Sequence, residues 1–261
     1  MRTPPSPLAT LRAVFMGYLP RLVQLRGWVV AGLPLLVALG GLGVSILLRL
    51  QGGTMGTDAT LVLYHQGLAS VMVPIMALVA APAGLREDLE QRVLPLLLVR
   101  PLPVWTLPFA RGAGWFLWGG LWLGVACLAL VPLGLELSVL PLHLLALLLA
   151  FWAELAFLTL LGLLFRRGTL WGVLALFLWD PLVRILPGRL QWFTFIHHVE
   201  SLTGTRSLQV RAHELLAQPP MDTAAWASAL TLLVLGLVCW AAAGWKLQVT
   251  PVGLSGVEGE G

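Results

Sequence analysis

Glu154 is the most chemically conspicuous residue of this chain, because it stands in the middle of a long apolar run, in the sequence Phe-Trp-Ala-Glu-Leu. An ionised carboxylate at membrane depth costs several kcal/mol unless it is paired or neutralised. One interpretation is a residue of a transport pathway or gate. The other, which we favour, is a protonated or hydrogen-bonded carboxyl group that ties helices together, with Tyr64, His65 or His143 as its partner.

Five residues of metal-ligating types gather ahead of the last apolar run: His197, His198, Glu200, His213 and Glu214. Zinc sites use such side chains at characteristic spacings. His213 and Glu214 lack the second histidine of an HExxH motif, since Ala217 stands at that place, and His197 is directly adjacent to His198. We therefore predict no metal site, and expect an interfacial amphipathic helix at about 190–202.

The chain is predicted not to be an enzyme. A Walker-type phosphate site needs a glycine-rich turn with a lysine followed by serine or threonine. Lys246 is the only lysine, and Leu247 follows it. An intramembrane enzyme would need an acid, a nucleophile or a metal set at one depth, and the sequence shows none apart from Glu154 and the histidines. Any ATP must be hydrolysed by another polypeptide.

The composition is that of an integral membrane protein. Hydrophobic residues make up 58% of the 261 residues and charged residues 11%, and the mean hydropathy is +0.89. About a quarter of the residues of a soluble domain are charged. The net charge of +4 offers no face for nucleic acid, so lipid and protein are the expected partners. Cys127 and Cys239 lie in apolar runs and predict no disulfide framework.

Six apolar runs are long enough to cross a bilayer: 27–48, 61–85, 104–133, 139–165, 169–186 and 223–245. We predict an all-α integral membrane protein with six transmembrane helices in one domain, 27–246. A tail and an interfacial helix, 1–26, precede this domain, and a second tail, 247–261, follows it. A tight turn is expected at 133–138, and an outer helical segment at about 187–222.

The basic residues predict the orientation. Six spans put both termini on one side, and five of the 16 basic residues fall on the other: Arg49, Arg184, Arg189, Arg206 and Arg211. Because basic residues favour the cytoplasmic side, both termini are predicted to be cytoplasmic. Arg111, early in the third span, is expected at the membrane interface, and Glu136 and Asp180, at span ends, are expected to be solvated or to cap helices.

The densest group of charges lies between the second and third spans, in the segment 84–103. Five charged residues fall within seven positions: Arg86, Glu87, Asp88, Glu90 and Arg92. Leu85, Leu89 and Val93 recur at helical spacing, which predicts a short amphipathic helix at about 86–98 on the cytoplasmic surface. A solvated loop helix without a partner is the alternative interpretation.

This segment, a glutamate-rich loop helix followed by leucines and Arg100-Pro, resembles the coupling helix of ABC-2 type ABC transporter permeases. The sequence Leu178-Trp179-Asp180-Pro-Leu is similar to the end of the fifth span in that family, where an acidic residue precedes an outward-facing helical hairpin. The family pattern has glutamate where this chain has Asp180. The resemblance covers nearly the whole chain, but the motifs that carry it are loosely defined.

The resemblance implies a permease subunit of an ATP-driven exporter in the cytoplasmic membrane of a bacterium or an archaeon. It would form the translocation path as a dimer, with a second copy or a paralogue. Each protomer would bind a separate ABC ATPase through residues 86–98, and ATP and Mg would be held by that ATPase and not by this chain. Asp180, His197 and His198 would belong to the outer loop.

An ion-coupled secondary transporter that uses Glu154 is the main alternative. Such transporters usually have broken helices at corresponding positions of two halves. Pro74 and Pro82, in the second span, have no clear counterpart in the fourth to sixth spans, which favours the exporter. Nearly uncharged spans mildly favour a hydrophobic cargo, but the sequence does not identify the substrate.

Overall fold

The computed structural model describes residues 15–17, 19–20, 22–53, 56–81, 106–165, 167–185, 189–204 and 223–249. Every regular element in these ranges is helical, which confirms the predicted all-α class for the described chain. The predicted helix at 86–98, with Arg86, Glu87, Asp88, Glu90 and Arg92, lies outside them, as do residues 1–14, 18 and 21 of the predicted tail and interfacial helix and residues 205–222.

Within the described ranges, five helical segments are long and apolar enough to cross a membrane: Leu25–Leu50, Ala59–Ala80, Leu107–Leu133, Leu140–Leu164 and Ala225–Val249. They coincide with five of the predicted spans to within a few residues. The predicted fifth span corresponds to a shorter apolar helix, Gly168–Val183. The protein is thus a helical, multi-pass membrane protein by length and composition, while a sixth crossing stays a prediction.

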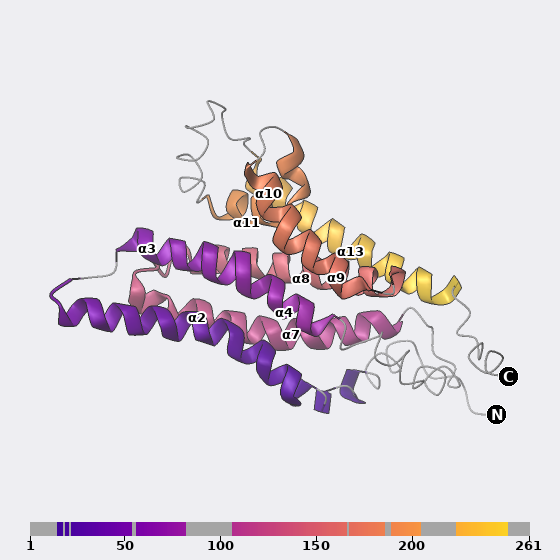
Figure 1. Ribbon diagram of the computed structural model, residues 1–261, viewed down its shortest axis with the longest axis horizontal. Helices are drawn as coiled ribbons and strands as arrows, with labels where there is room; N and C mark the ends of the chain where they lie inside the picture. The colour runs from indigo at the N-terminus through magenta and orange to yellow at the C-terminus, as the bar shows by residue number, and fades with distance from the viewer. Residues whose placement is uncertain are drawn as a thin grey trace.

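α8 (Leu140–Leu164) lies at the centre of the bundle. It packs against α13 (Ala225–Val249), α7 (Thr106–Ala129), α4 (Val73–Ala80), α9 (Gly168–Val173) and α11 (Phe195–Thr203). Its side chains Leu147, Phe151 and Leu155 are buried. α2 (Leu25–Leu50) packs on α7 and α4 at the edge of this group (Figure 1).

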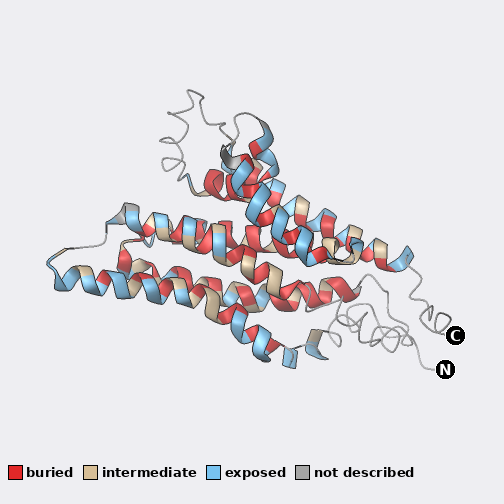
Figure 2. Cartoon of the chain, in the orientation of Figure 1, coloured by how far each residue is buried: buried red, intermediate tan, exposed pale blue. Residues whose placement is uncertain are grey.

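The outward faces of the helices are apolar. Large side chains stand exposed on α2, at Leu36 and Leu39, and on α7, at Leu117 and Leu121. Figure 2 shows the outward side of α2 largely exposed, while buried residues gather where the helices face one another. An exposed apolar belt over several long helices fits a lipid environment, where the helix carries its own backbone hydrogen bonds.

The antiparallel connections bring several helix ends together. α4 ends and α7 begins toward the same end of the molecule at which α8 ends and α9 begins, on the right in Figure 1. α13 also ends on that side. The segment 82–105, which carries the charged residues, therefore connects α4 to α7 at the end of the molecule where α13 also ends.

The predicted turn between the third and fourth spans is confirmed. A 3₁₀ turn, Val131–Leu133, is followed by Gly134 with a φ of +116°. Only glycine adopts this backbone conformation without steric cost, so the chain reverses direction here with little backbone strain. Thr60 Oγ1 donates a hydrogen bond of 2.6 Å to the carbonyl oxygen of Leu133, which fixes the turn to α3 (Thr57–Val62).

Two segments of the described chain have the wider turn of a π-helix: η1 (Leu63–Met72) and η3 (Leu174–Trp179). The Val73 amide bonds to the Leu68 carbonyl and the Asp180 amide to the Ala175 carbonyl, five residues back in each case. Pro74 and Pro181 follow directly, and a proline ring clashes with the carbonyl four residues before it, which favours the wider turn.

The expectation that Pro74 has no counterpart in the later spans is therefore wrong. Pro181 takes the same place after η3 that Pro74 takes after η1. The sequence showed both prolines, but only the backbone shows that the same local distortion precedes each one.

Candidate functional site

Tyr64, His65 and His143 form one buried cluster between η1 and the start of α8. The Tyr64 hydroxyl donates a hydrogen bond of 2.7 Å to the His143 carbonyl oxygen. The ring centroid of Tyr64 lies 4.7 Å from that of His65 and 4.7 Å from that of His143, edge to face in both cases. These contacts hold the second predicted span against the fourth.

The tautomer of His143 follows from its contacts. Nδ1 lies 3.0 Å from the carbonyl oxygen of Val139. A carbonyl can only accept, so Nδ1 donates and Nε2 of the neutral ring is left as an acceptor. That buried Nε2 has no hydrogen-bond partner within the described part of the chain.

Glu154 does not belong to this cluster. It follows His143 by eleven residues in α8, which is a rise of about 16 Å along the helix. The expectation that Tyr64 or His143 is its partner is therefore wrong, because the Tyr64 hydroxyl binds the His143 carbonyl and the two rings pack together near the start of α8. His65, which packs on Tyr64, lies with them.

Glu154 is instead deeply buried within the fourth span. Its side chain is 2% exposed, and Oε2 has no hydrogen-bond partner among the residues that the structure describes. Asp180, a second buried acid that the sequence singled out, is the first residue of α10 (Asp180–Ile185).

Asp180 caps α11. Its Oδ1 accepts a hydrogen bond of 2.9 Å from the Phe195 amide, and its Oδ2 accepts one of 3.3 Å from the Ile196 amide. The residue before the helix, Thr194, makes no side-chain cap of its own. Asp180 therefore supplies from a different helix the acceptors that the first turn of α11 needs, in agreement with the capping role expected for it.

Asp180→Ala is expected to lower the free energy of unfolding by about 1–2 kcal/mol, the usual cost of losing a cap. Asp180→Asn, which keeps one carbonyl oxygen, should lose less. Chemical unfolding of the purified protein in lipid nanodiscs measures both. Glu136→Ala is the matched control, because Glu136 is an exposed acid in the turn before α8. Equal midpoints for Asp180→Ala and the unaltered protein would contradict the capping role.

α11 is not the interfacial helix that the sequence predicts at 190–202. All seven residues from Ile196 to Leu202 are buried, and the helix packs against α8, α13 and η1. The apolar and the polar side chains of these seven residues both pack against other parts of the protein. The polar side chains can be buried because they have hydrogen-bond partners there. His197 Nε2 lies 3.0 Å from Thr223 Oγ1, and Ser201 Oγ donates to the His197 carbonyl at 2.7 Å.

His198 is held as a neutral ring. Its Nε2 lies 3.0 Å from the Trp192 carbonyl oxygen and therefore donates, while Nδ1 lies 3.2 Å from Ser228 Oγ. Burial lowers the pKa of His198, and the hydrogen bond to Trp192 raises it by less. No group of three or more histidine, cysteine or acidic side chains within the described ranges is placed to hold a metal.

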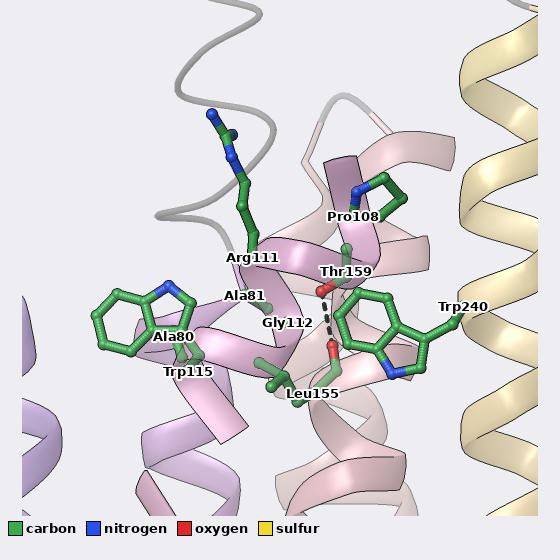
Figure 3. Close-up of a pocket in the computed structure, with 9 residues that line it drawn as sticks. All are labelled: Ala80, Ala81, Pro108, Arg111, Gly112, Trp115, Leu155, Thr159 and Trp240. Atoms are coloured by element: carbon green, nitrogen blue, oxygen red, sulfur yellow. Dashed lines mark hydrogen bonds between the residues drawn. The ribbon is translucent and has the colours of Figure 1, made fainter. Parts of the chain in front are cut away.

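A small cavity lies among α4, α7, α8 and α13, lined by Ala80, Ala81, Pro108, Arg111, Gly112, Trp115, Leu155, Thr159 and Trp240. Its volume is about 10 Å³, room for about one water molecule. Trp115 and Trp240 lie on opposite sides, and the Arg111 guanidinium points away from Thr159 (Figure 3). Arg111, expected at the membrane interface, is only 4% exposed.

The structure thus divides the predicted site residues into three groups. Tyr64, His65 and His143 lie together, Glu154 is buried farther along α8, and His197 and His198 lie on the helix that Asp180 caps. The five charged residues at 86–92 lie outside the described ranges. Searches with this chain find no matching family model, no matching curated protein and no matching solved structure.

Proposed function

We propose that this chain is the permease subunit of an ATP-driven ABC-2 type exporter, working as a dimer and coupled to a separate ATPase through residues 86–98. The observation that carries the proposal is the position of these residues in the chain. They join α4 to α7, and both helices pack directly on the central helix α8.

The mechanism follows from that connection. ATP binding would draw two ATPase subunits together, and each would pull on one helix at 86–98. Because Ala81 at the end of α4 and Arg111 in α7 line the same cavity as Thr159 of α8, a pull on the joining segment acts on all three helices. Tilting of these helices against a second protomer would open the path alternately to each side.

Co-purification tests the proposal. The protein is tagged in the organism that makes it, solubilised in a mild detergent, and analysed by mass spectrometry together with whatever stays bound. We expect a polypeptide with a Walker P-loop at about one copy per permease. An unrelated tagged membrane protein serves as the control. A fully recovered permease without any P-loop protein would contradict the proposal.

A secondary transporter is the second candidate, and one observation favours it. The distortions at η1 and η3 fall in the second and fifth predicted spans, corresponding positions of two three-helix halves, and such pairs are typical of ion-coupled transporters. Proteoliposomes that contain this chain alone decide between the two. Uptake driven by a proton gradient without any ATPase would replace the exporter proposal.

A further inference from the structure

We propose that the exposed side of η1 around Gln66 is the surface on which a second copy of this chain binds, with the Gln66 amides of the two copies hydrogen-bonded to each other. The inference names the surface, the partner and the central residue of the contact. It rests on the proposed function only for the expectation that the protein works as a dimer, and it uses no residue of the segment 82–105.

The first step is the depth of Gln66. It stands exposed in the apolar segment Ala59–Ala80. Its neighbour Gly67 packs on α2, where a Cβ atom at Gly67 would lie 2.8 Å from Val37 Cγ1. Val37 is halfway along α2 (Leu25–Leu50), about 18–20 Å from either end of that helix. Gln66 therefore lies level with the middle of a long apolar helix.

The second step is the contrast with the other exposed polar side chains of the five long helical segments. Three of them, within the described ranges, stand at helix ends: Arg26, Arg49 and Gln248. The fourth, Thr231 in α13, donates its hydroxyl to the Ala227 carbonyl oxygen of its own helix at 2.8 Å. The Gln66 amide has no hydrogen-bond partner in the described part of the chain.

The third step is the chemistry of the partner. A glutamine side chain has two N–H donors and an acceptor oxygen, and leaving them unpaired in an apolar medium is strongly unfavourable. Lipid tails offer neither donors nor acceptors. A second Gln66 offers both, because each amide can donate an N–H to the carbonyl oxygen of the other. A two-fold dimer sets the same patch of both copies face to face, so this surface fits a copy of itself.

The surroundings of Gln66 allow another helix to come close. Val62 is exposed four residues before it. On α2, Gly40 and Val44 follow Val37 by three and seven residues, the spacing of one helix face, and both are exposed. A Cβ atom at Gly40 would meet nothing within 4 Å. Small residues let membrane helices pack closely, and a polar side chain among them joins the helices.

Disulfide trapping in native membranes tests the contact. Gln66→Cys would place two thiols across the two-fold axis, within the Cβ separation of about 4.5 Å that a disulfide needs. We expect most of this variant to become a covalent dimer on mild oxidation. Leu121→Cys in α7 and Val234→Cys in α13, also exposed and inside their helices, should stay monomeric. The native cysteines are buried, and the unaltered protein measures their background.

Association in liposomes measures the hydrogen bonds themselves. Because single interhelical hydrogen bonds are weak, we expect Gln66→Leu to raise the dimer dissociation constant about three- to tenfold, and Gln66→Asn to raise it less. Thr231→Val is the matched control, since it removes an exposed hydroxyl that is already bonded within α13. Subunit counting by single-molecule photobleaching, at a series of protein-to-lipid ratios, gives the constants.

Three outcomes overturn the proposal. One is the absence of a disulfide in Gln66→Cys, whether its thiol reacts with a water-soluble reagent, as on a water-filled path, or does not, as against lipid. Another is an equal yield of covalent dimer from Leu121→Cys, which indicates random collision. The third is a Gln66→Leu protein that dimerises as tightly as the unaltered protein. If Gln66→Cys does not insert, Val62→Cys replaces it and is judged in the same way.

The ATPase that co-purifies is measured separately, so the two proposals can fail independently. A trapped dimer without an ATPase contradicts the exporter alone. An ATPase-bound chain without the trapped dimer contradicts the Gln66 contact alone.

Discussion

Replacing Glu87, Asp88 and Glu90 together by alanine is expected to reduce the amount of ATPase that co-purifies with this protein at least tenfold, or to leave ATP hydrolysis uncoupled from transport. The change removes three charges from the helix proposed to dock on the ATPase. A tenfold loss corresponds to about 1.4 kcal/mol of binding free energy. Three charged contacts across an interface can contribute this much.

The measurement is the ratio of ATPase to permease after affinity purification, with ATP hydrolysis by the recovered complex as a second readout. Glu136→Ala is the control, since Glu136 is an exposed acid in the turn between α7 and α8 and lies outside the segment that joins α4 to α7. Full ATPase association together with full transport in the triple variant would show that residues 86–98 are not the coupling element.

Gly236→Val is expected to lower the free energy of unfolding by about 3 kcal/mol, the upper part of the range for an overpacked site. A Cβ atom at Gly236, in α13, would overlap the indole Nε1 and Cδ1 atoms of Trp152 in α8. The indole has little room to move, because its ring centroid lies 5.5 Å from that of Phe116 and 5.9 Å from that of Trp240.

Chemical unfolding in nanodiscs measures the effect, and Gly124→Val provides the control, because a Cβ atom at Gly124 meets nothing within 4 Å. The double variant Gly236→Val with Trp152→Ala should recover part of the loss, since the two residues occupy the same space. A single Gly236→Val variant as stable as the unaltered protein would mean that α13 and α8 do not approach each other closely at this point.

The long apolar helices could be predicted from the sequence because the bilayer fixes how many apolar residues a span needs. The predicted runs at 27–48 and 139–165 agree with α2 and α8 to within a few residues. The turn at Gly134 was predictable for a similar local reason, because the long apolar run is interrupted there.

The candidate site could not be predicted in the same way. The sequence singled out Asp180 as a residue that could cap a helix, but not which one, because the amide it binds lies 15 residues further along the chain. The burial of α11 was also missed, because an amphipathic pattern does not tell whether the apolar face meets lipid or other helices. Pro74 and Pro181 were the available signal for η1 and η3.

The wide turns at η1 and η3 give two helices of the bundle one surplus residue each. Each residue of an α-helix turns the chain by about 100°. If such a turn migrates by one carbonyl at a time, the part of the helix ahead of it rotates while the part after the proline stays in place. Tyr64 could then swing away from His143 without α4 leaving α8, so these helices can change the face they present without being pulled apart.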